Sequence, residues 1–531
     1  MTIAHAADPL PCPTILGLEH ELGVCIEGVD AASLAPGESP AALLLRLGGV
    51  GVTCWDRNHF LENGGRLYVD CGDHPEYATP ECSTIEELVA ADSAGMAIVA
   101  AMAQRAEAAL AAERNAPVRL RVLRNNLSPN GASWGAHENY LVGAELSWTR
   151  LASQSASHLA SRVCCTGAGT VMAAGDHRRG EFRLSQRAPF VGTLVAASAV
   201  NTEYRKPFVL ARDEPLSDPR RHRRVQVACG DSTMSQTSTA LRVGATALAL
   251  HLVGAGAAPA VELSDPVAAL HTFAADPTLT ATAATSRGRM RALDLQWQWF
   301  EAAMRRLHQE GLPRGLASVL PLWEEVLSAL ERDPELLADR LDWVAKRRLM
   351  RQLVERDQLA WSDVRVLGLD LAYHELHAER SLFSRLVRAG LMRTLTPAGA
   401  VERALHEPPP TTRAAARGRL IRLLRTRRID YHAEWHYVVV RRRGGEDQVS
   451  LPDPSVPASE QVDALAAKTE EDAAALGGAG AVWWPWPSSE ALLAEAEGRV
   501  RPCDRGRFGA SPVDDVGRFD QLDSDFWPFV A

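Results

Sequence analysis

The stretch NGGRLYVDCGDHPEYAT, residues 63–79, combines a turn signal, a short strand and a second turn. Its glycine pair breaks any helix, and Pro75 fixes the chain after the strand. Because side chains alternate along a strand, Tyr68 and Asp70 share one face, and Glu76 follows in the second turn. Polar side chains are therefore held at a strand end and not scattered on a coil. This geometry suits a catalytic site.

The chain has 531 residues, enough for a large catalytic domain with smaller appendages. Its hydrophobic fraction is 46% and its charged fraction 23%, and no run reaches the roughly 18 apolar residues of a membrane helix. With 57 basic and 66 acidic residues the net charge is −9, which argues against binding to nucleic acid or to an anionic membrane. Residues 1–14 lack a basic start and an apolar run, so we expect no secretion signal and a cytoplasmic location.

Nine cysteines occur at irregular positions, and no pair has the Cys-x-x-Cys spacing of a zinc or redox site. We interpret them as reduced and mostly buried. They are Cys12, Cys25, Cys54, Cys71, Cys82, Cys164, Cys165, Cys229 and Cys503.

Hydrophobic periodicity separates a strand-rich first part from a helical second part. Apolar and polar residues nearly alternate over 15–25, which predicts a strand. An alanine-rich run over 84–113 predicts a long helix, opened by a capping box at Ser83 or Thr84. This order predicts an α+β fold with an antiparallel sheet. Further strands are predicted at 119–124, 137–143, 181–187, 225–229 and 434–440, and helices over most of 290–400 and at 413–427.

Shifts in composition divide the chain into three parts. We expect a catalytic domain at 15–405, a small C-terminal α/β domain at 406–456 and a partly ordered, Trp-rich extension at 457–531. Pro408 opens a PPPTT run that breaks the helical pattern at the first boundary. The extension contains WWPWP at 483–487, and its aromatic side chains could dock onto a partner or back onto the parent domain.

Two carboxylates come together on the first predicted strand. Glu19 and Glu21 share one side of it, about 6–7 Å apart, and oxygen ligands of this kind suit Mg²⁺ beside nucleotide phosphates. Alternating glutamates on a solvated strand face are the simpler alternative. His137, in the polar cluster HENY, and Glu76 add an imidazole and a third acid. The combined set favours a magnesium–nucleotide site.

Other polar residues leave two interpretations open. Asn125 and Asn126, at a predicted strand end, either orient a substrate or form a turn. Arg187 and Arg212 carry guanidinium groups that bind phosphate bidentately, with surface ion pairs as the alternative. The chain has no Walker-type phosphate loop, so nucleotide binding would have to use carboxylates, magnesium and arginines. The reaction itself stays open at this point.

These residues, in this order, resemble the family of the Pup ligase and the Pup deamidase/depupylase, which is related to glutamine synthetase and other carboxylate–amine ligases. The resemblance extends over about 15–456. It is carried by GLEHELG (17–23), NGGRLYVDCGDHPEYATPEC (63–82), NN (125–126), GAHENYL (135–141), LSQRA (184–188), ARDEP (211–215), GDSTMS (230–235), DWVAKRRL (342–349), LDLAYHEL (369–376) and PPPTTRA (408–414).

The resemblance implies a glutamine synthetase-like antiparallel sheet cradle for ATP and Mg²⁺, with the small domain packed against it. Ligases of this family convert the C-terminal glutamate side chain of the small protein Pup into a γ-glutamyl phosphate, and a lysine amine of a target protein then displaces the phosphate to give an isopeptide bond. Carried over by motif, Asp70 would be the catalytic carboxylate. The metal ligands would be Glu19, Glu21, Glu76 and His137; ATP and its phosphates would contact Tyr68, Arg66, Arg187 and Arg212; substrate would contact Asn125, Asn126 and Arg224.

Spacing favours the ligase branch of this family. The deamidases carry a longer insertion between Glu21 and Asn63 and one residue fewer between their aspartate and His-Pro-Glu, whereas Asp70 to His74 has the ligase spacing. Where the family usually has a histidine before Gly-Asp-Ser-Asn, this chain has Gln226, a poorer metal ligand that cannot carry a proton. We therefore expect an ATP-dependent ligase that joins Pup or a Pup-like modifier to lysine-bearing proteins. A deamidase/depupylase and a catalytically weakened modifier-binding protein are the alternatives.

Overall fold

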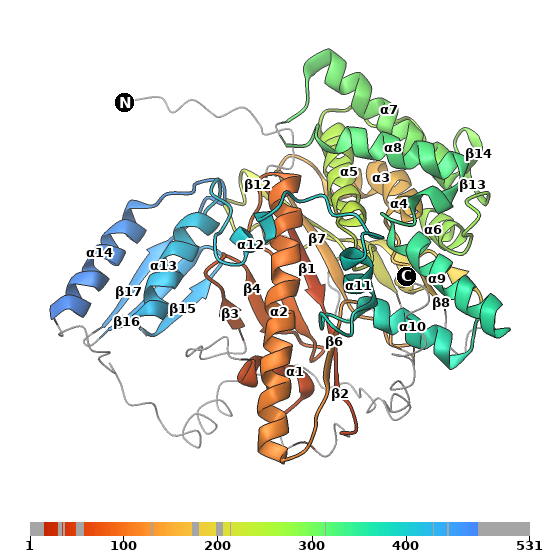
Figure 1. Cartoon of the computed structure of the whole chain (residues 1–531). Helices are drawn as coiled ribbons and strands as arrows, with labels where there is room; N and C mark the ends of the chain where they lie inside the picture. Colours follow the sequence, from red (N-terminus) through yellow and green to blue (C-terminus); the bar gives the residue numbers. More distant parts are fainter. Residues whose placement is uncertain are drawn as a thin grey trace, which may run out of the picture.

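Eight strands form the central sheet of the molecule (Figure 1). The computed structural model describes residues 15–475 except 30–33, 35–37, 49–57, 129–130, 172–179, 198–204, 213, 314, 428 and 443–444. Neighbouring strands are antiparallel, apart from the parallel pair β10–β11. The strand order is β10 (Val191–Ala196), β11 (Lys206–Leu210), β12 (His222–Val227), β7 (Ala136–Gly143), β1 (Leu16–Glu21), β5 (Pro75–Ala78), β4 (Arg66–Val69) and β3 (Asn58–Phe60).

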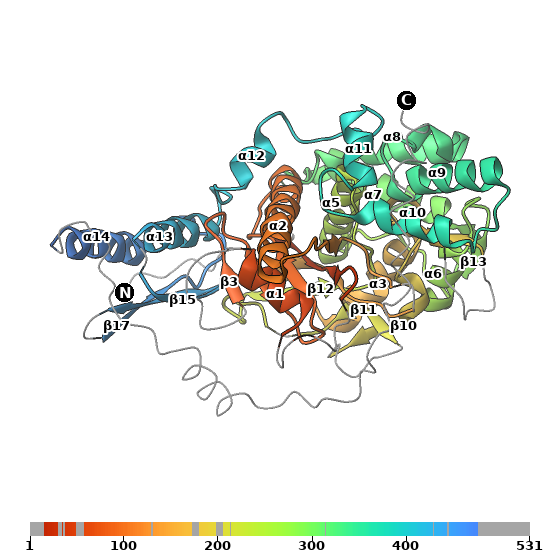
Figure 2. The ribbon, with the colours of Figure 1, turned by 60° about the horizontal axis from the view of Figure 1, so that its bottom comes forward.

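The central sheet has one buried face and one open face. On β1, Leu16, Leu18 and His20 are buried, whereas Glu19 and Glu21 point to the other side and are half-buried. Figure 2 shows the helices on one side of the sheet, which leaves the other side for polar residues. The helices in contact with the strands of the sheet include α2 (Ile85–Arg114), α3 (Trp148–Ser161) and α5 (Gln236–Gly254).

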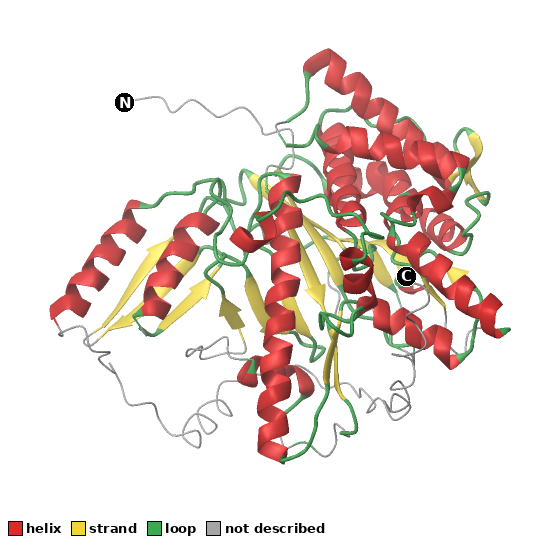
Figure 3. Ribbon diagram, viewed as in Figure 1, coloured by secondary structure: helices red, strands yellow, loops and turns green. Residues whose placement is uncertain are grey.

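A large helical part continues from the buried face, at the upper right of Figure 3. One apolar core runs from the sheet through these helices, and Trp299, Trp323 and Trp343 are almost wholly buried in it. The remaining elements of the catalytic part are α1 (Pro40–Leu47), α4 (Val163–Thr166), α6 (Pro266–Ala274), α7 (Ala292–Glu310), α8 (Val319–Arg332), α9 (Asp342–Asp357), α10 (Val364–His374), α11 (Leu382–Arg388), α12 (Ala400–Ala404), the short helices η2 (Ala188–Phe190) and η3 (Pro334–Leu337), and the two-stranded pairs β2 (Gly23–Ile26) with β6 (Leu120–Leu123), β8 (Thr170–Val171) with β9 (Phe182–Arg183), and β13 (Thr282–Thr285) with β14 (Gly288–Arg291).

The start of α2 follows directly from its sequence. Thr84 Oγ1 accepts a hydrogen bond from Glu87 N at 3.1 Å, and Glu87 Oε2 accepts one from Ser83 N at 2.9 Å. Thr84 is therefore the N-cap, and Glu87 accepts from the residue before the N-cap and not from Thr84 N, so the predicted capping box is only half formed. The helix ends at Asn115, whose φ of 49° lies in the left-handed region that asparagine tolerates.

A small second unit packs against the edge of the central sheet, at the left of Figure 1. Its core contains Leu420, Val438, Val462 and Leu465, together with Phe60 from β3. The helix α14 thus belongs to this core, although it lies beyond residue 456, and the Trp-rich segment at 483–487 lies outside the described residues. The elements of the unit are α13 (Ala414–Thr426), β15 (Tyr431–Glu434), β16 (Tyr437–Arg442), β17 (Gly445–Ser450) and α14 (Glu460–Ala475).

A buried ion-pair network fastens the small unit to the end of β5. Arg413 Nε donates to Glu81 Oε1 at 2.7 Å, and Arg417 Nη2 donates to Glu81 Oε2 at 2.5 Å. Arg417 also donates to the carbonyl oxygens of Gly64 and Trp435, each at 2.8 Å. Burial alone would raise the pKa of Glu81, but Arg417 and Arg413 lower it to about 2. The network therefore stays ionised at neutral pH.

The predicted α+β class and its antiparallel sheet cradle are confirmed, while three predicted strands were wrong in detail. The strand predicted at 15–25 is interrupted, because from Gly23 on the chain pairs with β6 and no longer with β5. Of 181–187 only two residues are strand, because Asp231 accepts backbone hydrogen bonds that hold the rest as a loop. The strand predicted at 434–440 contains a two-residue hairpin turn.

Within the described residues, no helix is both long and apolar enough to span a membrane.

Replacing Arg417 by alanine should lower the free energy of unfolding by about 3–5 kcal/mol at pH 7, because it leaves the buried Glu81 carboxylate short of a partner. Urea denaturation followed by circular dichroism measures this difference. Arg419→Ala, on the same helix, is the matched control: its ion pair with Asp463 is exposed and should contribute less than about 1 kcal/mol.

The Arg417→Ala difference should also depend on pH. Because the pKa of Glu81 is lowered from 4.5 to about 2, its stabilising contribution is complete above pH 4.5 and is lost as the pH falls towards 2. A difference that stays constant over this range would contradict the assignment to Glu81.

Candidate active site

Five polar side chains gather on the open face of the central sheet. Ligand atoms of Glu19, Glu76 and His137 lie within 4.8 Å of one another, and so do those of Glu21, Asp70 and Glu76. Glu76 belongs to both sets, so the five residues form one continuous group, called here the carboxylate cluster. The structure thus brings the four predicted metal ligands together with the predicted catalytic carboxylate.

The register of four strands builds this cluster. Glu19 on β1 lies opposite His137 on β7, and Glu21 on β1 lies opposite Glu76 on β5. Directly opposite residues of an antiparallel pair point to the same face, with Cβ atoms about 4.5–5.5 Å apart. Glu76 is in turn opposite Tyr68 on β4. Side chains that are up to 118 residues apart in sequence therefore meet over one patch of sheet.

Glu19 is held in its ionised form by three neighbours. His137 Nδ1 lies 3.3 Å from its carboxylate, Gln226 Nε2 donates to it at 2.9 Å, and Arg224 Nη1 lies 3.8 Å away. Burial alone would raise the pKa of Glu19, but these neighbours lower it to about 2. The first carboxylate of the cluster is therefore an anion at neutral pH.

Glu21 and Glu76 are shifted in opposite directions. Burial would raise the pKa of Glu21, but His137 and the backbone N–H of Gly135, which donates to Glu21 Oε2 at 2.5 Å, lower it overall. The pKa of Glu76 lies well above its ordinary value, because burial and then the carboxylates of Glu19 and Glu21 oppose its ionisation. A divalent cation relieves repulsion of this kind, and carboxylate oxygens with one imidazole are suitable ligands for it. The residues present therefore fit a magnesium site.

Asp70 follows the last residue of β4, at the rim of the cluster. Its Oδ1 accepts a hydrogen bond from His74 N at 2.6 Å, closing a turn in which Asp73 has a φ of 63°. The His74 ring stacks on Trp134 with ring centroids 4.9 Å apart, which fixes the far side of the turn. Burial and then the charge of Glu21 raise the pKa of Asp70, as suits a carboxylate that accepts a proton. The Asp70-to-His74 spacing thus sets the shape of the turn that holds Asp70.

Arg66 and Tyr68 occupy the open face of β4 beside the cluster. The Arg66 guanidinium carbon lies 4.4 Å from the centroid of the Tyr68 ring, and Arg66 Nε donates to Asn58 Oδ1 at 2.7 Å. Burial and then the carboxylates of Glu76 and Glu19 raise the pKa of Tyr68 well above its ordinary value. Tyr68 is therefore a neutral phenol next to a charged guanidinium.

Two further cationic side chains lie beside the loop that contains Trp134 and leads into β7. Arg187 is buried and donates through Nη1 to Trp134 O at 3.0 Å, and Lys206 Nζ donates to Ser133 O at 3.1 Å. Burial and then the charge of Arg187 lower the pKa of Lys206 to about 8, although the carboxylates of Glu21 and Asp70 act to raise it. Sequence reasoning missed Lys206, because its place beside the cluster is set by how β11 packs.

The strand β12 closes the cluster on its other side. Gln226 Nε2 reaches Glu19, while Gln226 Oε1 is buried with no hydrogen-bond partner among the described residues. Arg224 Nη1 donates to Asn139 Oδ1 at 3.0 Å. Arg212 lies two residues beyond the end of β11 and is half-buried. Gln226 therefore lies beside the predicted metal ligand Glu19, with a carbonyl oxygen that has no partner among the described residues.

The two predicted substrate-binding asparagines lie in the interior. Asn126 is wholly buried: its Oδ1 accepts from Ser232 N at 2.5 Å, and its Nδ2 donates to Gly135 O at 3.1 Å. Asn125 Nδ2 donates to Leu127 O at 2.6 Å. These bonds shape the loops behind the cluster and favour the turn alternative. Contact of the two asparagines with substrate stays a prediction.

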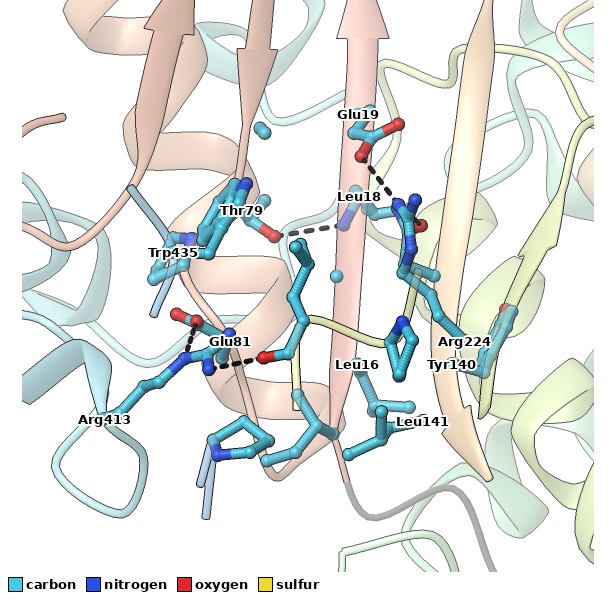
Figure 4. Close-up of a pocket in the computed structure, with 18 residues that line it drawn as sticks. Leu16, Leu18, Glu19, Thr79, Glu81, Tyr140, Leu141, Arg224, Arg413 and Trp435 are labelled. Atoms are coloured by element: carbon cyan, nitrogen blue, oxygen red, sulfur yellow. Dashed lines mark hydrogen bonds and ion pairs between the residues drawn. The ribbon is translucent and has the colours of Figure 1, made fainter. Parts of the chain in front are cut away.

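A groove leads from the cluster to the small unit (Figure 4). Glu19 and Arg224 lie at one end, and Trp435 and Arg413 lie at the other. An aromatic ring and a guanidinium at one end, with carboxylates and a cation at the other, suit a ligand that carries a planar base and phosphates. Trp435 and Arg413 were not predicted as site residues, because only the docking of the small unit brings them here. The groove is lined by Ile15, Leu16, Gly17, Leu18, Glu19, Ala78, Thr79, Pro80, Glu81, Asn139, Tyr140, Leu141, Pro215, Leu216, Arg224, Arg413, Trp435 and Pro454.

The open antiparallel sheet, the carboxylate cluster and the groove define a class of α+β enzymes with a site for a metal and a nucleotide. A family model described as Pup-ligase protein matches residues 19–439. The chain therefore belongs to the Pup-ligase family, as the sequence resemblance implied.

Relatives and solved structures agree with this assignment. The chain is 38% identical over 458 residues to a Pup–protein ligase of Acidimicrobium ferrooxidans, covering 85% of this chain and 98% of that protein. It is 38% identical over 434 residues to one of Micrococcus luteus, covering 79% and 91%. The crystal structure of a complex between the prokaryotic ubiquitin-like protein Pup and its ligase PafA matches with a TM-score of 0.78 and 31% identity, over 92% of this chain and 98% of that one. A structure of PafA in complex with ADP matches with a TM-score of 0.71 and 32% identity, over 78% and 91%.

Replacing Gln226 by alanine should weaken binding of Mn²⁺, used as a probe for Mg²⁺, by about tenfold, because Glu19 loses a hydrogen bond that orients it. Isothermal titration calorimetry with the full chain and ADP measures this affinity. Gln448→Ala, at an exposed position of β17, is the matched control and should leave the affinity unchanged. Equal affinities in the Gln226→Ala and Gln448→Ala proteins would contradict a role for Gln226.

Proposed function

We propose that this protein is an ATP-dependent carboxylate–amine ligase that activates a glutamate side chain of Pup, or of a Pup-like modifier, and joins it to a lysine amine of another protein as an isopeptide bond. The observation that carries the proposal is the carboxylate cluster at the end of a groove suited to a nucleotide, in a chain of the Pup-ligase family. The relatives named Pup–protein ligases and the Pup- and ADP-bound structures of PafA support the same activity.

The chemistry of its two ends favours one orientation for ATP in the groove of Figure 4. Its base lies against Trp435 and Arg413, and its phosphates point to Glu19, where Arg224 adds positive charge. Mg²⁺, when bound, neutralises the phosphates and makes the terminal phosphorus easier to attack. Glu19, Glu21, Glu76 and His137 would hold it.

The reaction has two steps that the site residues serve differently. A γ-carboxylate oxygen of the modifier attacks the terminal phosphorus of ATP, which gives an acyl phosphate and ADP. Arg66, Arg187 and Lys206 supply positive charge near the phosphoryl group, with Tyr68 and Arg212 beside them. A lysine amine then attacks the acyl carbon and phosphate leaves, while Asp70 takes up the proton that the amine must lose.

Asp70 is suited to that second step by its surroundings. Burial and the nearby Glu21 raise its pKa, so its carboxylate is a stronger base than an exposed one. The same residue could activate water in a hydrolase, so the ligase direction rests on the family and on the Asp70-to-His74 spacing. Lysine-bearing target proteins, a cytoplasmic location and the three-part domain division remain parts of the proposal.

Replacing Asp70 by asparagine should lower the rate of conjugate formation by about 10²–10⁴-fold, because the amine loses its general base. The assay contains ATP, Pup with a C-terminal glutamate and a lysine-bearing acceptor protein, and the conjugate is quantified on a denaturing gel. ADP affinity, measured by calorimetry, should not change. Asp73→Asn, in the same turn, is the matched control, because asparagine tolerates the positive φ of that position. Full activity of Asp70→Asn would contradict the role of Asp70.

Replacing Trp435 by alanine should raise the KM for ATP by about tenfold, since stacking of a base on an aromatic ring contributes about 1–3 kcal/mol. The rate at saturating ATP should change much less, because Trp435 lies at the end of the groove away from the reacting phosphate. Steady-state kinetics with ADP release as the readout separates the two parameters. Trp435→Phe should restore most of the affinity. A fall in kcat with an unchanged KM would place the nucleotide elsewhere.

A further inference from the structure

Asn126 joins three separate segments of the chain from the interior of the molecule. Its backbone N–H donates to Gln186 Oε1 at 2.7 Å, and its side-chain Oδ1 accepts from Ser232 N at 2.5 Å. Its Nδ2 donates to Gly135 O at 3.1 Å and to Trp134 O at 3.4 Å, and its backbone carbonyl accepts from Trp134 N at 3.3 Å. Asn126 is wholly buried, and each of its polar groups has a partner within the chain. This arrangement is typical of a residue that holds neighbouring segments together.

One of these segments lies directly against the carboxylate cluster. Gly135 N donates to Glu21 Oε2 at 2.5 Å, and Glu21 N donates to Gly135 O at 3.2 Å. A Cβ atom on Gly135 would collide with Glu21 Oε1 and with His137 Cε1, so only a residue without a side chain fits there. The backbone of Gly135 is therefore the support against which two of the predicted metal ligands rest, and Asn126 holds its carbonyl.

A ring of hydrogen bonds leads from Asn126 back to the same strand. Ser232 N donates to Asn126, and Ser232 Oγ lies 3.0 Å from His20 Nδ1. His20 precedes Glu21 on β1 and is wholly buried on the opposite face of the sheet. Asn126 is thus connected to β1 on both faces, to Glu21 through Gly135 and to His20 through Ser232. A connection of this kind fixes the strand and the facing loop relative to each other.

Three successive carbonyl groups before β7 are each held by a side chain from a different part of the chain. Lys206 Nζ donates to Ser133 O, Arg187 Nη1 to Trp134 O and Asn126 Nδ2 to Gly135 O. Arg187 and Lys206 are among the cationic groups proposed to face the phosphoryl group, whereas the amide of Asn126 is neutral and wholly buried. A change at Asn126 therefore tests the support of this segment separately from the binding of phosphate.

The hydrogen bond from Gly135 N matters because it orients one carboxylate oxygen of Glu21. Asp70 and Glu76 each have an oxygen within 4.8 Å of the Glu21 carboxylate, so acidic groups crowd this side chain. A fixed donor keeps the Glu21 carboxylate in place against them. Partners that orient a metal ligand commonly contribute about ten- to a hundredfold to metal affinity. Loss of the support behind Gly135 should therefore weaken the binding of a divalent cation.

We propose that Asn126 is a positioning residue for the metal ion: by holding the carbonyl of Gly135, it keeps the Gly135 N–H aimed at Glu21. Asn126 acts from behind the sheet and does not contact the substrate, in contrast to the role that the resemblance implies for it. The inference rests on the proposed magnesium-dependent function. It gives the buried Asn126–Ser232 connection a purpose in the site, beyond the packing of the loops.

The test measures Mn²⁺ binding to the full chain in the presence of ADP by isothermal titration calorimetry. Asn126→Ala should weaken Mn²⁺ binding about tenfold. Asn126→Asp should do the same, because it keeps an oxygen for Ser232 N and loses the amide donor to Gly135. Asn63→Ala is the matched control, since Asn63 is also wholly buried and hydrogen-bonded through both ends of its amide. It should lower stability to urea in the same way and leave Mn²⁺ affinity unchanged.

A pair of double variants tests whether the effect passes through Glu21. In a Glu21→Ala background, Asn126→Ala should have little further effect on Mn²⁺ affinity, because the carboxylate that it orients is gone. In a Glu19→Ala background the loss of about tenfold should persist. An undiminished effect of Asn126→Ala in the Glu21→Ala background would overturn the inference, and so would equal Mn²⁺ affinities of the Asn126→Ala and Asn63→Ala proteins.

Steady-state kinetics separate positioning from substrate contact. The Asn126→Ala protein should need about tenfold more Mg²⁺ for half its maximal rate, with an unchanged KM for Pup that ends in glutamate. A raised KM for Pup with unchanged Mn²⁺ affinity would overturn the inference in favour of substrate contact and leave the proposed function standing. If the wild-type protein binds no Mn²⁺, the proposed magnesium site fails and the inference fails with it.

Discussion

The pairing of β1 with β5 and β7 is the constraint on which the rest of the structure depends. It places Glu19 opposite His137 and Glu21 opposite Glu76, on the one face of the sheet that no helix of the described chain covers. A shift by one residue would turn both glutamates into the apolar core and move Leu18 to the open face, so the register is fixed by the burial of the opposite face. The same alternation thus builds the core and the site.

Like charges gathered in this way destabilise the folded protein unless they are compensated. The structure compensates Glu19 with His137, Arg224 and Gln226, and it leaves Glu76 with a raised pKa. The repulsion that remains would favour the binding of a cation among these carboxylates. Gln226 donates a hydrogen bond to Glu19 and, as an amide, adds no titrating group to this balance.

Much of the site was predictable because it follows from the alternation of side chains along a strand and from short turn motifs. The alternation around Glu19 and Glu21 and the turn after Asp70 set the direction of these side chains within a few residues. The interior position of Asn126 was not predictable, because it depends on a hydrogen bond to Ser232, 106 residues away. Trp435 and Lys206 were missed for the same reason: their place in the site is set by how the small unit and β11 pack, and no local pattern reports that. The turn at 435–436 was missed because a two-residue hairpin without glycine gives no clear signal.

The buried network of Glu81, Arg413 and Arg417 links the two units and the two ends of the groove. Arg417 donates to the backbone of Trp435, and Arg413 lines the groove itself, so residues that fasten the small unit also shape the groove proposed for the nucleotide. The small unit is therefore a wall of the site as well as a separately packed core.

In the proposed reaction, the carboxylate cluster and the groove activate a carboxylate as an acyl phosphate. Transfer of oxygen-18 reports this step, with Pup labelled in the side-chain carboxylate of its C-terminal glutamate, unlabelled ATP and an acceptor protein. Each conjugate formed should release one inorganic phosphate carrying one oxygen-18 atom, detected by mass spectrometry or by the shift of its phosphorus resonance. Phosphate without the label, or label found in AMP, would exclude an acyl phosphate formed from ATP in this way.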